Sequence, residues 1–274
     1  MLKVTAVEEV MKVGATFPLR VICSDSQQYI LKAQNDYVIN GKMLFNEVIA
    51  NRFAKLVDIP TPPAAIGILP KSIILNNKVE NLEKYGFKDG KCFLSKYIPG
   101  TSLSINPISL RWISNVEVIP NLILFDTILM NSDRDGNPGN WFREKSTKKL
   151  IAIDHSNIFR LAQVWNKDSL KQDETIPPEI IDAIKGSDYK ILMQQYEEHL
   201  HKNGWHHHQH QHPFSVMGRK INLISKEQIQ NCFINIPQEW DISDEDKKAA
   251  INFLEFQVNH IDDIILELEQ LFQL

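Results

Sequence analysis

The sequence lacks a basic excess, and this absence argues against one class of partner. Its 274 residues contain 30 lysines and arginines against 34 aspartates and glutamates, which gives a formal net charge of −4. A dedicated nucleic-acid-binding protein carries a clear excess of basic residues, so no nucleic-acid partner is expected. The nearest basic cluster, at Lys145, Lys148 and Lys149, is typical of a solvated turn.

Cysteines and long apolar runs are also scarce. The three cysteines, Cys23, Cys92 and Cys232, match neither a zinc-ligand spacing nor a disulfide framework, which fits a reducing compartment. The N-terminus has no basic-then-apolar leader, and no apolar run reaches the roughly 18 residues that a membrane span needs. We therefore expect a soluble, cytoplasmic protein with no membrane partner.

The first hundred residues have the pattern of a sheet with one helix. Residues 18–23 and 28–34 are strand-like runs joined by a turn-rich tetrapeptide, which predicts a hairpin. Apolar residues recur at helical spacing over 41–57, and the proline-rich stretch that follows ends the helix. The runs 64–70 and 91–98 are predicted to be further strands.

A proline–glycine break at residues 99–103 divides the chain. Beyond it the pattern is mostly helical. The apolar segment 118–130 leads into a polar loop, and 148–159 has the pattern of a buried strand. The sequence therefore predicts a sheet-rich part over 1–98 and a mainly helical part over 99–274.

The C-terminal residues 251–272 carry apolar side chains at alternating spacings of three and four. This pattern predicts one amphipathic helix packed on the larger part. The same spacing is compatible with a homodimeric coiled coil, which is the less favoured interpretation. Ser243 and Asp246 indicate a helix start that resembles a capping box.

The loop NSDRDGNPGNWF places oxygen-bearing side chains at alternate positions. Asp133, Asp135 and Asn137 fall at positions one, three and five of a calcium loop, and Glu144 falls at position twelve. However, Pro138 occupies position six, where the sharp turn needs glycine. The segment after the loop also has the pattern of a strand, whereas an EF-hand requires a helix. A calcium site is therefore the less favoured hypothesis.

Phosphoryl transfer gives a second interpretation of the same loop. It needs a carboxylate near the acceptor hydroxyl, oxygen ligands for magnesium on ATP, and a lysine that neutralises phosphate charge. Asp133, Asn140 and the strand-terminal Asp154 provide the carboxylate and the oxygen ligands. Lys32 lies in an apolar strand, and Glu47 on the following helix is spaced to form an ion pair with it. Burial of Asp154 without a partner would be costly, which favours a metal ligand.

These residues resemble the HipA-like kinases. NSDRDGNPGNWF followed by LIAIDHS is similar to their catalytic loop and metal-binding aspartate, and also to the phosphatidylinositol 3- and 4-kinases. FPLRVICSDSQQYILKAQ, LFNEVIANRFAKLVDIPTPP and CFLSKYIPGTSL resemble the nucleotide-binding lobe of small HipA-like proteins. The likeness spans roughly residues 10–160. It implies an α+β, two-lobed protein-kinase-like fold with a sheet-rich N-terminal lobe and a mainly helical C-terminal lobe.

The resemblance also implies roles for the loop residues. Asp133 would be the catalytic base that orients the acceptor hydroxyl, and Arg134 would organise the loop. Asn140 and Asp154 would be the magnesium ligands. The family usually places the asparagine five positions after the aspartate, whereas here the interval is seven. Asn137 is therefore a competing ligand.

The nucleotide contacts follow from the same resemblance. Lys32 would contact the α- and β-phosphates, with Glu47 as its partner. The loop over the phosphates would be MKVGATFP, whose single glycine is Gly14; its backbone amides would bind phosphate. The hinge that hydrogen-bonds adenine through its backbone would consist of Ser95, Lys96 and Tyr97.

The run HHHQHQH at 206–212 suggests a metal site. Consecutive imidazoles cannot all converge on one ion, and metal sites need ligands that outer contacts hold in place. We therefore expect an exposed loop.

We predict an ATP- and magnesium-dependent phosphotransferase. The expected acceptor is a Ser/Thr hydroxyl of a protein, because no membrane-binding anchor favours a lipid; a small-molecule acceptor stays open. Thr16 and Ser102 are candidate sites of self-modification. The alternative is a nucleotide-binding pseudokinase that acts as a regulatory or interaction module.

Overall fold

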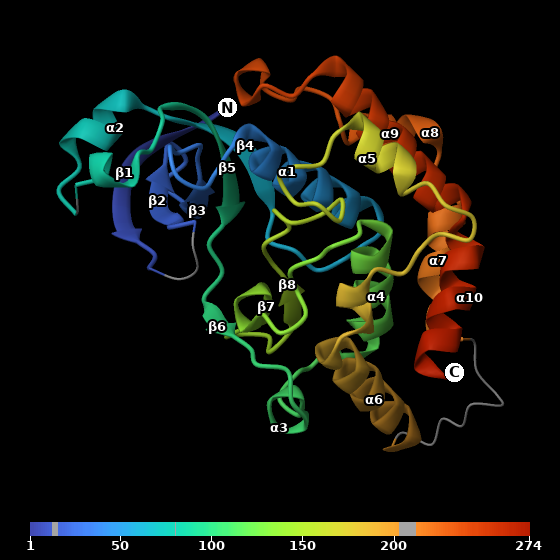
Figure 1. Cartoon of the computed structure of the whole chain (residues 1–274). Helices are drawn as coiled ribbons and strands as arrows, with labels where there is room; N and C mark the ends of the chain where they lie inside the picture. Colours follow the sequence, from blue (N-terminus) through green and yellow to red (C-terminus); the bar gives the residue numbers. More distant parts are fainter. Residues whose placement is uncertain (13–15, 80, 203–211) are drawn as a thin grey trace.

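The chain begins with a closed barrel of five strands (Figure 1). The structure, a computed structural model, describes residues 1–12, 16–79, 81–202 and 212–274. The order around the barrel is β1-β2-β3-β5-β4; β1 pairs with β4 in parallel, and the other pairs are antiparallel. The barrel strands are β1 (Leu2–Val10), β2 (Leu19–Cys23), β3 (Gln28–Lys32), β4 (Ala64–Leu69) and β5 (Gly90–Lys96).

Alternating burial explains why the barrel strands form. Leu19, Val21 and Cys23 of β2 are buried inside, whereas the residues between them are partly exposed. Leu19 pairs with Leu31 of β3 in the hairpin that the sequence predicted. Because side chains alternate between the faces of a strand, this register directs the apolar residues into one core, which also includes Leu94 of β5.

Helix α1 (Gly41–Leu56) lies between the barrel and the rest of the chain (Figure 1). Asn40 caps its start by accepting a hydrogen bond from the Met43 amide at 3.1 Å. A Cβ atom on Gly41 would lie 1.8 Å from the backbone oxygen of Trp240. Glycine is therefore required at this close approach of two backbones, which fixes the N-terminus of α1 against the C-terminal part of the chain.

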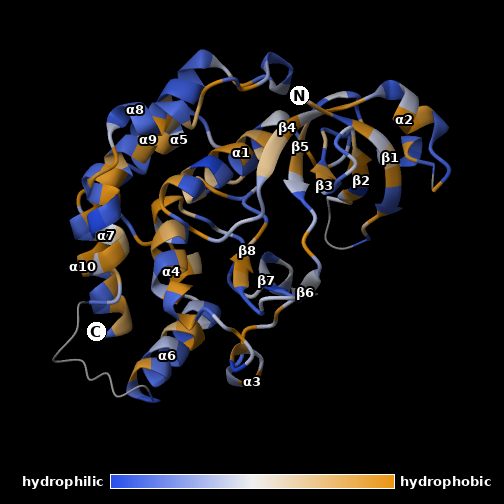
Figure 2. Cartoon of the chain, turned by 180° about the vertical axis from the view of Figure 1, so that it is seen from behind, coloured by the Kyte–Doolittle hydropathy of each residue, from blue (hydrophilic) through white to orange (hydrophobic). Residues whose placement is uncertain are grey.

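The remainder contains a small antiparallel sheet and mostly helices. Its sheet has the order β6-β7-β8, formed by Gly100–Ser102, Trp141–Glu144 and Leu150–Ala152. Helix α4 (Ile119–Ile128) is almost wholly buried and appears as one of the most apolar helices in Figure 2. The other helices are α2 (Lys71–Asn76), α3 (Pro107–Leu110), α5 (Lys167–Gln172), α6 (Ser187–Lys202), α7 (Ser215–Asn222), α8 (Lys226–Asn231), α9 (Asp244–Asn259) and α10 (Ile261–Phe272).

The predicted C-terminal helix is in fact two helices. Helices α9 and α10 are separated at His260, whose amide completes the last turn of α9 by donating to Phe256 O at 3.1 Å. The break allows Ile261, Ile264 and Leu268 to be buried in the same core as α4 and α7. This apolar stripe is thus used within the chain, and homodimerisation through it stays a prediction.

Two further expectations can be placed. The Ser243 hydroxyl caps α9 by accepting from the Asp246 amide at 3.0 Å, although the Asp246 carboxylate has other partners. Residues 206–211 of the histidine run lie outside the described residues, as does Gly14. In the described part of the chain, no helix is both long and apolar enough to cross a membrane.

We expect Phe53→Ala to lower the free energy of unfolding by about 3–5 kcal/mol. Phe53 of α1 is fully buried and stacks on Phe125 of α4, with ring centroids 6.0 Å apart. The substitution would leave a cavity between these two helices. Urea denaturation measures the loss. The control is Leu266→Ala, because Leu266 is half-exposed and its loss should cost less than about 1 kcal/mol. Equal effects of the two substitutions would contradict the packing described here.

Candidate active site

A cavity of about 550 Å³ lies where the barrel, α1 and the β6–β8 sheet meet. Its walls contain most of the residues that the sequence singled out. They are Lys32, Glu47, Ser95, Lys96, Tyr97, Asp133, Asn137, Asn140 and Asp154. Segments that are more than a hundred residues apart in the chain therefore contribute to one pocket.

Lys32 joins three elements at the centre of this cavity. It is the last residue of β3, and its Nζ lies 2.5 Å from Glu47 Oε1 on α1 and 2.8 Å from Asp154 Oδ1. Burial alone would lower the pKa of Lys32, but the two carboxylates outweigh this effect and raise it above its ordinary value. The ammonium is therefore charged in the folded chain.

Asp154 follows β8 at a backbone φ of +56°, in the left-handed region. Burial alone would raise the pKa of Asp154, but the Lys32 ammonium outweighs it and holds the pKa below its usual range. Oδ1 also accepts a hydrogen bond from the Ser156 hydroxyl at 2.7 Å. Oδ2 has no hydrogen-bond or ion-pair partner among the described residues, so it is available for a cation.

The next residue, His155, strengthens the same cluster. Its amide donates to Glu47 Oε2 at 3.2 Å, and its ring packs edge-on against Phe125. Burial lowers the pKa of His155 well below its usual value, so the ring is neutral. The backbone after Asp154 thus fixes the second oxygen of Glu47.

Three side-chain amides orient the Asp133 carboxylate. Its Oδ2 accepts from Asn137 at 3.2 Å, from Asn140 at 3.1 Å and from Asn157 at 2.8 Å. Its Oδ1 has no hydrogen-bond partner within the described ranges. The carboxylate is therefore held by one oxygen, and the other oxygen is left for a ligand in the cavity.

The two candidate metal-ligating asparagines differ in how their oxygens are used. Asn137 Oδ1 accepts from the Gly139 amide at 3.2 Å and caps the short 3-10 helix Pro138–Asn140. Asn140 donates through Nδ2 to Asp133 O at 2.6 Å, and its Oδ1 is not paired with any described residue. The geometry favours Asn140 over Asn137 as a cation ligand.

Arg134 lies beneath the cavity and does not line it. The fully buried guanidinium pairs with Asp126 of α4, with Nε 2.6 Å from Oδ2. It also donates to Asn140 O at 2.6 Å and to Ile153 O at 2.9 Å. Arg134 therefore bonds beside both candidate cation ligands, and its role as organiser of the loop stays a prediction.

Asp135 points away from the cavity, which excludes the EF-hand arrangement. Its Oδ1 accepts from the Asp188 amide at the start of α6 at 2.8 Å. Glu144, the twelfth position of the hypothetical calcium loop, lies in β7 and bonds Ser146 and Thr147. A strand follows the loop where an EF-hand needs a helix, so the calcium hypothesis is wrong in its geometry.

The hinge region already uses some of its backbone donors. Lys96 N donates to Pro63 O at 2.8 Å, and Tyr97 N donates to Gln28 O at 3.0 Å. Pro63 has no N–H, so it cannot donate back to the Lys96 carbonyl. The amide of Ile98, which lines the cavity, has no partner in the described chain. Lys96 O and Ile98 N are therefore the available hinge groups.

Several residues of the site were not found in the sequence analysis. Asn157 and Asp126 belong to the network around Asp133 and Arg134, and Asn46 of α1 contacts the segment after Asp154. The spacing of Asn157, three residues after Asp154, is the only local signal that was present. Asp126 is a buried carboxylate in the mostly apolar α4, and Asn46 is a buried amide of α1; burial demands a partner for each.

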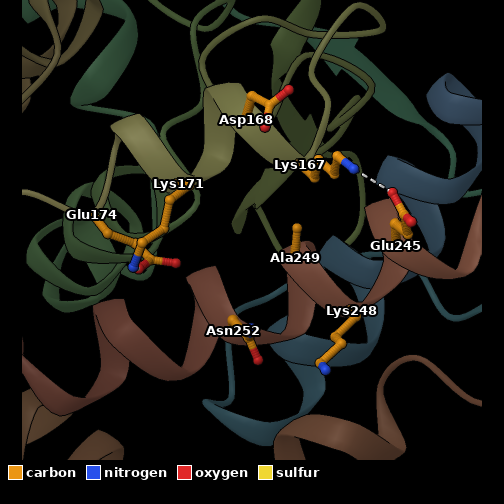
Figure 3. Close-up of a pocket in the computed structure, with 8 residues that line it drawn as sticks. All are labelled: Lys167, Asp168, Lys171, Glu174, Glu245, Lys248, Ala249 and Asn252. Carbon is orange, nitrogen blue, oxygen red and sulfur yellow. Dashed lines mark hydrogen bonds and ion pairs between the residues drawn. The ribbon is translucent and has the colours of Figure 1, made fainter.

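A second hollow, of about 330 Å³, lies between α5 and α9 (Figure 3). Its charged side chains are largely paired: Lys167 with Glu245, and Lys171 with Glu174. None of the predicted site residues lines it. This arrangement is that of a solvated, ion-paired groove between two packed helices.

Comparisons with known proteins bear on the family and the fold. The family model described as HipA-like kinase matches residues 4–172. The crystal structure of the Helicobacter pylori proinflammatory kinase CtkA is similar over 96% of both chains, at 14% identity and a TM-score of 0.56. This likeness shows that the chain has a kinase-like α+β fold.

Two more distant structures were also found. The Golgi casein kinase is 9% identical over 98% of this chain and 73% of its own, with a TM-score of 0.48. HipA of Shewanella oneidensis MR-1, in a complex with HipB and operator DNA, is 10% identical over 97% of this chain and 68% of its own, with a TM-score of 0.45. A comparison with curated protein sequences gave no match.

We expect Asp126→Ala to lower the free energy of unfolding by about 3–5 kcal/mol, because it leaves the buried Arg134 charge without its partner. Chemical denaturation measures the loss. Glu198→Ala removes an ion pair with Lys202 that is exposed at both ends and should have a much smaller effect. A loss for Asp126→Ala no larger than that for Glu198→Ala would contradict the proposed structural role of the buried pair.

The lowered pKa of Asp154 predicts a specific pH dependence. The unfolded chain binds this proton more readily, since an ordinary aspartate has a pKa of about 3.9. Stability from this carboxylate is thus fully present above that value and is lost as the pH falls toward the folded-state pKa. The difference in unfolding free energy between wild type and Asp154→Asn should be largest above about pH 5 and should narrow by about pH 3. A difference that is constant over this range would argue against the Lys32–Asp154 pair.

Proposed function

Since the chain belongs to the family of HipA-like kinases, we propose that it transfers the γ-phosphoryl group of ATP to a Ser/Thr hydroxyl of a protein, with Mg²⁺. One observation carries the proposal. Lys32, Asp133, Asn140 and Asp154 line a single cavity, where the barrel, α1 and the β6–β8 sheet meet. Phosphoryl transfer asks mainly for positioning and charge neutralisation, and these four groups are suited to both.

The donor set fits magnesium. Mg²⁺ prefers oxygen ligands and usually takes one or two protein ligands, with phosphates and waters completing its shell. Asp154 Oδ2 and Asn140 Oδ1 are the oxygens free for it. The described residues contain no group of three or more His, Cys, Asp or Glu that could hold a metal by itself, so the phosphates would have to complete this site. Bound there, the ion would neutralise charge on the β- and γ-phosphates.

Asp133 is the proposed catalytic base. Three amides hold its Oδ2, so Oδ1 is directed without further side-chain reorganisation. In this role Oδ1 accepts the hydrogen bond of the acceptor hydroxyl and takes its proton as the new P–O bond forms and the bond to the leaving β-phosphate oxygen breaks. Lys32 balances charge on the α- and β-phosphates, and Glu47 holds the ammonium in place.

The adenine is proposed to bind at the hinge. Lys96 O would accept from its exocyclic amine, and Ile98 N would donate to a ring nitrogen. Apolar side chains of the cavity, including Ile30, Phe93 and Phe142, would cover the faces of the base. This proposal keeps the predicted hinge of Ser95, Lys96 and Tyr97 and extends it by one residue.

We expect phosphate transfer from γ-labelled ATP to a protein acceptor, measured with a panel of generic protein substrates and with the chain itself. Asp133→Asn should lower the rate by about 10²–10⁴-fold, the usual contribution of a general base, and should leave ATP binding in place. Asp154→Asn should abolish magnesium-dependent transfer. Glu198→Ala, on the exposed face of α6, serves as the control and should retain the wild-type rate.

Two outcomes would contradict this proposal. If the wild-type chain binds ATP in calorimetry but no acceptor becomes labelled, the alternative of a nucleotide-binding pseudokinase is supported. If label is transferred equally by wild type and Asp133→Asn, the assigned base is wrong. Lipid and small-molecule acceptors in the same panel test the class of acceptor.

A further inference from the structure

Asn46 connects helix α1 to the 155–166 segment, which follows the proposed metal ligand Asp154. The side chain is completely buried. Its Nδ2 donates to Ser156 O at 2.7 Å and to Ala162 O at 2.8 Å, and its Oδ1 accepts from Trp165 Nε1 at 3.0 Å. One amide group therefore ties together the beginning, the middle and the end of the segment.

Only an asparagine suits this arrangement at this size. Its amide supplies two N–H donors and one acceptor oxygen, and all three functions are used. An apolar residue would leave two carbonyls and an indole N–H without partners, and such buried groups are costly to leave unsatisfied. An aspartate has nearly the same shape but would face two carbonyl oxygens with an oxygen of its own.

The end of the segment has a second anchor. The Trp165 ring is fully buried and packs against Phe45 of α1, with ring centroids 5.5 Å apart. Lys42, also on α1, donates to Trp165 O at 2.5 Å and lies 4.5 Å above its ring. Lys42 in turn pairs with Asp246 of α9 at 2.9 Å, and Asp246 accepts from the Lys167 amide.

The connection leads directly to the proposed catalytic groups. Asn46 and Glu47 are consecutive residues of one helix, so a shift of the segment relative to Asn46 is also a shift relative to Glu47. Ser156, whose carbonyl Asn46 holds, bonds the Asp154 carboxylate through its hydroxyl. The Asn46 amide thus fixes α1, and with it the Glu47–Lys32 pair, at a set distance from the backbone that carries Asp154.

The 155–166 segment forms its hydrogen bonds to Asn46 without phosphorylation of any residue. In many kinases the corresponding segment becomes ordered only when a phosphorylated residue pairs with arginines. Here the arginine of the segment, Arg160, is already paired with Asp173 and Glu179. In this chain the uncharged Asn46 side chain, and not a phosphorylated residue, bonds the segment to α1.

We propose that Asn46 is a positioning residue that holds the 155–166 segment in its active arrangement, so that the unmodified chain is catalytically competent. This inference rests on the proposed function and adds how the site is kept assembled. According to this inference, Asn46 is necessary for turnover, although its side chain contacts neither nucleotide nor acceptor.

The test compares Asn46→Asp with wild type at a temperature at which both are folded. We expect kcat, normalised to the number of ATP-binding sites found by calorimetry, to fall at least about 10-fold, because a misplacement of about 1 Å can cost 10²-fold. The KM for ATP should change less than about threefold, since the hinge contacts of adenine do not involve α1. Trp165→Phe removes one of the three bonds and should give a smaller decrease in kcat.

Asn115→Asp is the matched control. Asn115 is also buried, but its amide bonds Leu150 of β8, donating to the carbonyl at 3.1 Å and accepting from the amide at 2.7 Å, and not the 155–166 segment. This variant should lose stability and keep its normalised kcat within about threefold. A normalised kcat of Asn46→Asp within threefold of wild type, or an equal loss in Asn115→Asp, would overturn the proposal.

Hydrogen exchange separates this inference from the proposed function. Amides of the 155–166 segment should exchange at least about 10-fold faster in Asn46→Asp than in wild type, whether or not phosphate transfer is detected. In Asn115→Asp their exchange rates should equal those of wild type. Unchanged exchange in Asn46→Asp would overturn the proposal even if the kinase is active. Wild-type protein that has been treated with phosphatase should transfer phosphate from ATP at the same initial rate as untreated protein, without a lag. A lag that is removed by prior incubation with ATP would show that modification is required.

Discussion

The site depends on one buried ammonium group held by two carboxylates. Lys32 belongs to the barrel, Glu47 to α1 and Asp154 to the segment directly after β8. Buried charges are tolerated only when they are paired, so each of these elements is locked to the others by electrostatics. Together with Asp133, the cavity is lined by three carboxylates against two lysines, Lys32 and Lys96. Such an excess of negative charge in a low-dielectric cleft attracts a divalent cation.

A second buried ion pair, between Arg134 and Asp126, holds the backbone of the 131–142 loop in place. Arg134 bonds Asp126 on α4, and its remaining donors reach Asn140 O and Ile153 O. These carbonyls belong to one proposed metal ligand and to the residue before the other. The guanidinium fork is rigid, so it sets the separation of the two ligand-bearing backbones. Lys32 thus holds the carboxylates of Glu47 and Asp154 together, whereas Arg134 sets the distance between the backbones at Asn140 and Ile153.

The sequence predicted the residues whose signals are local. Asp133, Asn140 and Asp154 stand in a loop and at a strand end, where a polar residue after an apolar run is conspicuous. Lys32 and Glu47 followed from a strand and helix in the right order. The hairpin of β2 and β3 was also predicted correctly, because alternation and a turn determine it.

The missed features depend on contacts between distant segments. Asn46 and Asp126 look like ordinary polar residues of their helices, and only the folded chain shows that Ser156 and Arg134 are their partners. The division of the C-terminal helix at His260 was missed for a similar reason. The heptad spacing continues across the break, and only burial against α4 and α7 explains the change of direction.

The C-terminal hundred residues have a part in the site although the family model ends at residue 172. Asp188 accepts from Gly136 N and Trp141 Nε1, and Tyr189 donates to Asp126. From the other side, Asp246 holds Lys42 of α1. These contacts reach the loop before β7 and its first residue, then α4 and α1, and none of these C-terminal residues lines the cavity itself. These residues therefore support the walls of the cavity through a few polar contacts and contribute no group to its lining among the described residues.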